Sequence, residues 1–268
     1  MELIKALVLG ALQGATEFIP VSSSGHLVIV PALLGWKEPN LTFAMALHMG
    51  TFLAVFIYYF KDVVNLIKGF FATFKRNRTT TETFHSKLCW LIIIALIPAG
   101  IAGLIFSNDI DRTFGQPHYV SYFFFVTAFL LIVASLVKIK EPLKIEDMGI
   151  KNALAAGLLQ IISLLPGVSR SGATMSGGIF SGMNKEDAAK FSFLLSIPTI
   201  LGAGILTVRD MFSVSQAFSM GEFFTGFLAA FIVGILSIKF FFSIVRRTNF
   251  YFFAIYCILI GVAGLIFI

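Results

Sequence analysis

Six long apolar stretches limit what this chain can fold into more than any other feature of its sequence. A helix needs roughly 20 residues to cross a bilayer, and each stretch approaches or reaches that length. The chain is 57% hydrophobic and 13% charged, whereas a soluble domain carries about 25% charged residues. We therefore predict an all-α polytopic membrane protein, in which helices satisfy the backbone polar groups. The six stretches cover residues 41–60, 88–107, 119–138, 191–209, 221–241 and 250–268.

Two further apolar regions, residues 6–35 and 152–182, are interrupted near the middle by Ser, Gly and Pro. Each half is too short to span the bilayer, so we expect two re-entrant helix pairs that return to the side from which they enter. Lys and Arg concentrate in residues 61–87, 138–151 and 246–247, and the positive-inside rule places these loops in the cytoplasm. Both termini then face outward, and the two pairs enter from opposite faces.

The two interrupted regions also resemble each other in sequence. When Gly10 is set against Gly157, the runs GALQGATEFIPVSSSG and GLLQIISLLPGVSRSG share seven identical residues over sixteen positions, where roughly one is expected by chance. Similar segments that enter from opposite faces are typical of an inverted-topology repeat, with a site near the midplane between the repeats. We predict one membrane domain, 1–268, with repeat halves at 1–138 and 139–268.

The first interrupted region contains the residues that could act on a substrate. Gln13 and Glu17 are four apart and share a helix face, and an ionisable residue at membrane depth is functional by default. The structural alternative is a neutral Glu17 that hydrogen-bonds neighbouring helices. The next half-helix opens with the run Ser22-Ser23-Ser24-Gly25-His26.

That run predicts an anion site, because a helix N-terminus presents free N–H groups and a positive dipole end. Capping alone would explain one or two of the serines. Ser23 and His26 are three apart and would share a helix face, and a hydroxyl near an imidazole is the basic unit of nucleophilic catalysis. Taken alone, this pair is weak evidence.

Arg170 stands at the position of the second repeat that is equivalent to Ser23. Its planar guanidinium suits phosphate oxygens, although an ion pair with Glu17 would be a structural explanation. We predict that its neighbours also bind phosphate, through hydroxyl groups and close backbone approach. These neighbours are Ser169, Ser171, Gly172 and Thr174, together with Ser22, Ser24 and Gly25 of the first repeat.

The pattern as a whole favours a phosphate-bearing lipid bound at membrane depth. An acyl or glycosidic substrate would not need both Arg170 and two helix N-termini. His48 lies alone on an apolar helix, where packing is at least as good an explanation as function, so we place it behind the site together with Gln13. The basic loops indicate contact with anionic lipids, and we expect no nucleic-acid partner.

Both motifs closely resemble the signature motifs of the undecaprenyl-pyrophosphate phosphatase family, the bacitracin-resistance type of membrane phosphatase. The resemblance covers the whole chain and rests on Glu17-Phe18-Ile19-Pro20-Val21-Ser22-Ser23-Ser24-Gly25-His26 and Pro166-Gly167-Val168-Ser169-Arg170-Ser171-Gly172-Ala173-Thr174. It implies hydrolysis of undecaprenyl pyrophosphate to the monophosphate, which recycles the lipid carrier for peptidoglycan. It also implies the bacterial cytoplasmic membrane, with a site that opens to the outer, periplasmic side. A homodimer is left open.

The resemblance also implies roles for four residues and a divalent cation, Mg²⁺ or Ca²⁺. Ser23 would be the nucleophile, His26 the acid–base partner, Glu17 the activating carboxylate and Arg170 the phosphate clamp. His26 and an activated water remain alternative nucleophiles. Gln13 departs from a position that is often Glu in the family, which makes a metal role there doubtful and leaves Glu17 as the possible ligand. A transporter or flippase for an anionic lipid or solute is the alternative function, since inverted repeats are typical of transporters.

Overall fold

The computed structural model describes residues 2–114, 116–211, 219–247 and 249–268. These residues form twelve α-helices, and their only β-type pairing is a single bridge between Leu143 and Met183. In chain order the helices are α1 Leu3–Glu17, α2 Ser23–Leu33, α3 Leu41–Tyr58, α4 Phe60–Ala72, α5 Thr80–Ile105, α6 Ser107–Phe114, α7 Pro117–Leu136, α8 Ile150–Ile162, α9 Arg170–Phe180, α10 Lys185–Met211, α11 Met220–Ile244 and α12 Tyr251–Phe267.

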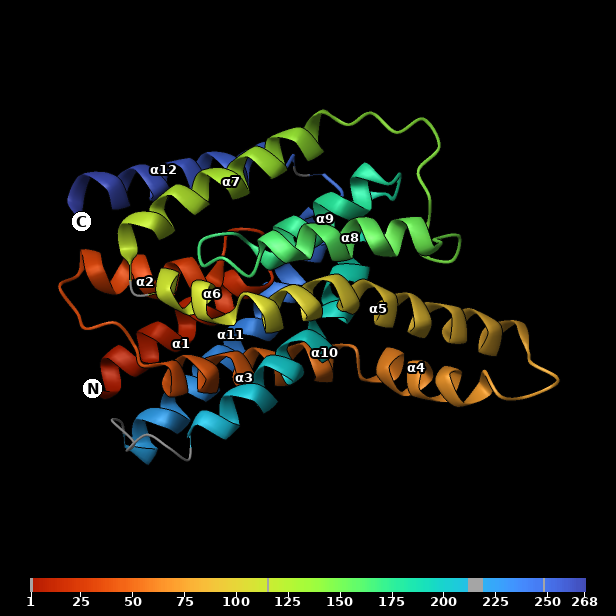
Figure 1. Cartoon of the computed structure of the whole chain (residues 1–268), viewed down its shortest axis with the longest axis horizontal. Coiled ribbons are helices and arrows are strands. Elements are labelled where there is room, and N and C mark those ends of the chain that lie inside the picture. Colours follow the sequence, from red (N-terminus) through yellow and green to blue (C-terminus); the bar gives the residue numbers. More distant parts are fainter. Residues whose placement is uncertain (1, 115, 212–218, 248) are drawn as a thin grey trace.

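Five of these helices, α3, α5, α7, α10 and α11, are long and apolar enough to cross a membrane. The prediction of an all-helical, multi-pass membrane protein is therefore confirmed. The sixth predicted stretch forms α12, which is apolar but has only 17 residues. Figure 1 shows α7 and α12 side by side along one edge of the molecule, and the two helices pack against each other.

Two spanning helices begin earlier than their apolar stretches predict, because polar residues cap them. α5 begins at Thr80, where the Thr79 hydroxyl accepts the Glu82 N–H at 3.2 Å and the Glu82 carboxylate accepts the Thr79 N–H at 2.9 Å. Such a capping box satisfies two of the free N–H groups at a helix start. α10 begins at Lys185. Its first turn carries two acidic residues, whose negative charges interact favourably with the positive end of the helix dipole.

Close backbone contacts pack α1 and α8 against two of the spanning helices. A Cβ atom on Gly10 of α1 would lie 2.2 Å from the Gly226 carbonyl oxygen of α11, and one on Gly157 of α8 would lie 2.4 Å from the Ala95 oxygen of α5. Helices inside membranes associate through such small residues, which let backbones approach. Both short helices are thereby fixed against longer ones.

The turns after α1 and α8 meet near the centre of the molecule (Figure 1). Ser171 at the start of α9 donates its hydroxyl to the Ile19 carbonyl at 3.3 Å. A Cβ atom on Gly25 of α2 would lie 2.9 Å from the Gly167 Cα atom. The C-terminal ends of α1 and α8 and the N-terminal ends of α2 and α9 therefore converge on one place.

Candidate active site

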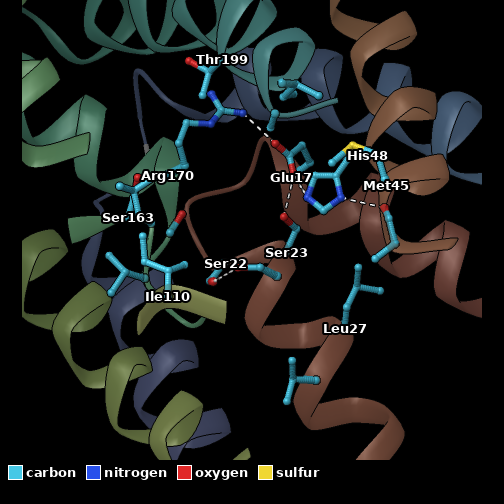
Figure 2. A pocket seen from close by; sticks show the side chains of 18 of the residues that line it. Glu17, Ser22, Ser23, Leu27, Met45, His48, Ile110, Ser163, Arg170 and Thr199 are labelled. Carbon is cyan, nitrogen blue, oxygen red and sulfur yellow. Dashed lines mark hydrogen bonds and ion pairs between the residues drawn. The ribbon is translucent and has the colours of Figure 1, made fainter. Parts of the chain in front are cut away.

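The converging helix ends border a cavity of about 610 Å³. Figure 2 shows its polar end, where Arg170 and Ser23 point toward Glu17 from opposite sides. Most of the remaining wall is apolar. It includes Leu27, Val28, Met45, Ile110, Leu164 and Ile200. A cavity with one charged end and a long apolar wall suits an amphiphilic ligand.

Glu17, the last residue of α1, is the centre of the polar end. Its Oε1 atom accepts a hydrogen bond from Arg170 Nη2 at 2.7 Å. Its Oε2 atom accepts the Ser23 hydroxyl at 2.5 Å and Gln13 Nε2 at 2.9 Å. Because the side chain of Glu17 is only 5% exposed, these partners compensate for burial of its charge. One carboxylate thus joins both repeats.

Arg170, the first residue of α9, is held on two sides. Besides its bond to Glu17, its Nη1 atom donates to the Ser192 carbonyl of α10 at 3.1 Å. Thr174 donates its hydroxyl to the Arg170 carbonyl at 2.8 Å and also bonds the Ser192 hydroxyl at 2.6 Å. The Arg170 side chain lines the cavity and is 13% exposed. Its guanidinium is therefore fixed where an anion in the cavity would meet it.

The structure confirms that two serines act as N-caps at the starts of α2 and α9. Ser22 accepts the Gly25 N–H at 3.3 Å and Ser169 accepts the Gly172 N–H at 3.0 Å. Ser22 has a φ of 69°, which is strained for a residue other than glycine and is often found at functional sites. The cap leaves the Ser23 hydroxyl free to bond Glu17.

His26 points away from Ser23 and the cavity. Its ring is fully buried, its Nδ1–H donates to the Ser22 carbonyl at 2.7 Å, and its Nε2 atom accepts the Tyr256 hydroxyl at 2.8 Å. The ring also stacks on Tyr256 of α12, with an interplanar angle of 7°. Among the described residues no hydrogen bond joins Ser23 and His26, so the structure does not bring together the pair whose spacing predicts a shared face.

His48 of α3 lies at the cavity instead. Its Nδ1–H donates to the Ala44 carbonyl at 2.8 Å, and its Nε2 atom is 3.8 Å from Glu17 Oε2. Because a carbonyl can only accept, Nδ1 is the donor in this bond, and Nε2 is the ring nitrogen that faces Glu17. Figure 2 shows the ring facing Glu17 on the side opposite Arg170. Its position on an apolar helix offers no reason to rank His48 above a packed residue.

The other predicted phosphate-binding residues divide into two groups. Ser22, Ser24 and Ser169 line the cavity with Ser23 and Arg170. The second group is buried where the two turns and α10 pack together, and does not line that cavity. It comprises Gly25, Ser171, Gly172 and Thr174.

Several contributing residues carry no signal in the sequence. Thr127 of α7 accepts the Ser169 N–H and donates to the Gly167 carbonyl, both at 2.9 Å, so it holds the second turn. Tyr256 lies within the apolar stretch 250–268, where no motif distinguishes it from its neighbours. Glu38, between α2 and α3, also lines the cavity, and burial raises the pKa of its carboxyl group. Only the three-dimensional packing brings these side chains to the site.

The described residues contain no group of three or more His, Cys, Asp or Glu side chains arranged to hold a metal ion. The described cavity lining contains two carboxylates, Glu17 and Glu38, and both oxygens of Glu17 already accept hydrogen bonds from Arg170, Gln13 and Ser23. A divalent cation prefers several oxygen ligands. This set of donors does not fit a cation bound by the protein alone.

The chain is similar to known proteins over nearly its whole length. Residues 6–263 match the protein family described as "Bacitracin resistance protein BacA". The chain is 38% identical over 274 residues to the "Undecaprenyl-diphosphatase" of Methanosphaera stadtmanae, covering 99% of this chain and 98% of the relative. It is 40% identical over 258 residues to the protein of that name from Caldicellulosiruptor bescii, covering 96% and 94% respectively. To the "Undecaprenyl-diphosphatase 1" of Shouchella clausii it is 38% identical, covering 100% and 97%.

Proposed function

The chain belongs to the bacitracin resistance protein BacA family, and from this premise we propose how its cavity carries out the reaction. That reaction is hydrolysis of undecaprenyl pyrophosphate to undecaprenyl phosphate and inorganic phosphate. It recycles the lipid carrier for cell-wall synthesis and confers bacitracin resistance. The observation that supports this site most directly is the Glu17 carboxylate, which joins a serine hydroxyl to a phosphate-binding arginine in one polar pocket.

We infer that α1–α2 and α8–α9 are re-entrant pairs in an inverted repeat whose sixth spanning helix is α12. α2 and α9 begin and end at equivalent positions of the aligned repeats, Ser23–Leu33 and Arg170–Phe180. In each pair, the end of the second helix also lies close to the start of the first helix. The Lys5 ammonium lies 5.5 Å from the Trp36 ring centre, and Asn152 donates to the Ser181 carbonyl at 2.9 Å.

The orientation is also a proposal: both termini and the cavity face the outer side of the bacterial cytoplasmic membrane. Figure 1 shows the α4–α5 connection, which holds basic residues of the loop 73–79, at the end of the molecule opposite both termini. The positive-inside rule places this connection in the cytoplasm. Cysteine labels in the loop that react only from outside would reverse the assignment.

In the proposed mechanism Arg170 and the N-termini of α2 and α9 bind the pyrophosphate group. Ser23 Oγ attacks the terminal phosphorus while the bridging P–O bond breaks, and undecaprenyl phosphate leaves with that electron pair. Glu17 accepts the Ser23 proton. Water then attacks the phosphoserine, its Oγ–P bond breaks, Glu17 returns its proton to the Ser23 oxygen, and both water protons leave with the inorganic phosphate. Positioning and charge stabilisation supply most of the rate in phosphoryl transfer.

We propose that His48, rather than His26, assists Glu17 in these proton transfers. Its Nε2 atom faces the same carboxylate oxygen that accepts the Ser23 hydroxyl. His26 would have to break its bond to Tyr256 before it could take part. Its proposed role is to fix α2, and hence Ser23, against α12. Direct attack by an activated water is the alternative that a search for phosphoserine tests.

The divalent cation also remains a proposal. Because Glu17 is already paired with Arg170, we propose that the pyrophosphate, and not the protein alone, would hold Mg²⁺ or Ca²⁺. The cation would neutralise phosphate charge, while the residues of the chain bind and orient the anion.

Phosphate release from undecaprenyl pyrophosphate by the purified protein in detergent tests the proposal. Wild type should release phosphate, and Glu17→Ala and Arg170→Ala should not. Arg246→Ala is the matched control, because Arg246 pairs with Glu186 at the surface and does not line the cavity. Equal rates for all four proteins would contradict the proposed site.

A further inference from the structure

Gln160 of α8 is buried in the cavity wall, and its carboxamide makes no hydrogen bond to a described residue. The side chain is 1% exposed and lines the cavity together with Arg170 and Ser163. Its Oε1 atom has no hydrogen-bond partner within the described chain. An unpaired buried amide is destabilising compared with an apolar side chain of the same shape. A role in binding a ligand would explain why an amide stands there.

A comparison of the two repeats explains why the Gln160 amide has no partner among the described residues. In the first repeat the equivalent residue, Gln13, donates its Nε2–H to Glu17 Oε2 at 2.9 Å. In the aligned second repeat the position equivalent to Glu17 is Leu164. Gln160 therefore lacks the carboxylate that engages Gln13, and its N–H groups are available to a ligand.

The surroundings of Gln160 select an anion as that ligand. Arg170 supplies positive charge to the same cavity, and α9 begins there with its N–H groups. The neighbouring Ser163 does not compete for the amide, because its hydroxyl donates to the Gln160 backbone carbonyl at 2.7 Å. Phosphate oxygens accept hydrogen bonds, whereas Leu164, one helical turn after Gln160 and also in the cavity wall, is apolar.

We propose that Gln160 is a substrate-binding residue whose side-chain N–H donates to a phosphate oxygen of the bound pyrophosphate. Its Oε1 atom then takes a hydrogen bond from water carried with the pyrophosphate. This inference rests on the proposed pyrophosphate site at Arg170. Gln160 acts in binding and does not transfer protons, so its effect is on KM.

The test compares steady-state phosphate release by wild type, Gln160→Leu and Gln160→Glu, together with their melting temperatures in detergent. A hydrogen bond to a charged group corresponds to about tenfold to a hundredfold in affinity. Gln160→Leu should therefore raise KM by about tenfold or more, leave kcat within about threefold, and melt no lower than wild type. Gln160→Glu should raise KM further, because a carboxylate cannot donate and repels phosphate.

Three outcomes would overturn the inference. One is an unchanged KM in Gln160→Leu. The second is a lower melting temperature with loss of kcat, which indicates that the amide binds a structural water. The third is a wild-type KM in Gln160→Glu, which indicates that the amide is no donor. Gln116→Leu is the matched control, because Gln116 lies before α7, outside the cavity, and its amide donates to the Arg112 carbonyl at 3.3 Å.

Two further variants separate this inference from the proposed function. If only the inference fails, Ser23→Ala and Arg170→Ala lose activity while Gln160→Leu behaves as wild type. If the proposed site itself fails, Ser23→Ala and Arg170→Ala retain activity as well.

Discussion

Replacement of Glu17 by glutamine separates the structural role of this residue from its chemical role. Glutamine keeps the shape of the side chain but removes its charge. Arg170, whose side chain is 13% exposed and 2.7 Å from Glu17 Oε1, would then be a nearly buried cation without its counter-ion. Removal of one partner of a buried ion pair costs about 3–5 kcal/mol. Because Arg170 also reaches the cavity, we expect the lower part of that range, about 3 kcal/mol.

The same change should lower kcat by a larger factor than lost stability explains. Glu17 Oε2 accepts the Ser23 hydroxyl at 2.5 Å, so glutamine removes the group that accepts its proton. A positioned general base contributes about 10²–10⁴-fold to the rate. We therefore expect kcat of the folded variant to fall at least about a hundredfold.

A double-mutant cycle gives the sharpest measurement. Glu17→Gln, Arg170→Gln and the double variant are compared by thermal or denaturant unfolding in detergent and by phosphate release. Since the double variant leaves no unpaired charge, its stability should recover to within about 1 kcal/mol of wild type, while its activity stays lost. The reasoning is refuted if the two stability losses simply add, or if Glu17→Gln keeps kcat within about tenfold of wild type.

Three further predictions concern other parts of the molecule. His48→Gln should lower kcat by about 10²-fold with little change in melting temperature, because the ring contributes to proton transfer more than to packing; a large stability loss would favour a packing role. Gly10→Ala should destabilise by about 1–3 kcal/mol, because its Cβ would lie 2.2 Å from a carbonyl oxygen, whereas Gly100→Ala, with nothing within 4 Å, should be tolerated. Arg246 pairs with the Glu186 carboxylate at the surface, so this pair stabilises the protein while the carboxylate is ionised and less once acid protonates it. The melting-temperature difference between wild type and Glu186→Gln should accordingly be present at neutral pH and shrink in acid; a difference that grows in acid would contradict this sign.

The sequence was most informative where a residue type conflicts with its surroundings. An acidic and a basic residue in apolar segments, Glu17 and Arg170, required partners, and the structure pairs them at 2.7 Å. The repeat alignment likewise placed Ser22 and Ser169 at equivalent helix starts, and both are N-caps. These inferences depend on local rules of charge burial and capping, which hold before the fold is known.

What the sequence could not supply is the direction of each side chain across helices. A spacing of three predicts that Ser23 and His26 share a face. The ring of His26 instead hydrogen-bonds the Tyr256 hydroxyl, 230 residues away in the chain. His48 and Gln160 line the cavity only because α3 and α8 pack around the two turns. Helix starts were missed for a related reason: the capped first turn of α5 is polar, so apolar periodicity does not mark it.

Phosphate release from undecaprenyl pyrophosphate by Ser23→Ala tests the central claim most directly. The matched control is Ser243→Ala, since Ser243 lies exposed on α11 and donates to the Phe240 carbonyl of its own helix. We expect the control to match wild type, Ser23→Ala to lose activity while keeping its melting temperature, and a quenched wild-type reaction to contain phosphate on Ser23. Release by Ser23→Ala at the wild-type rate would contradict the account.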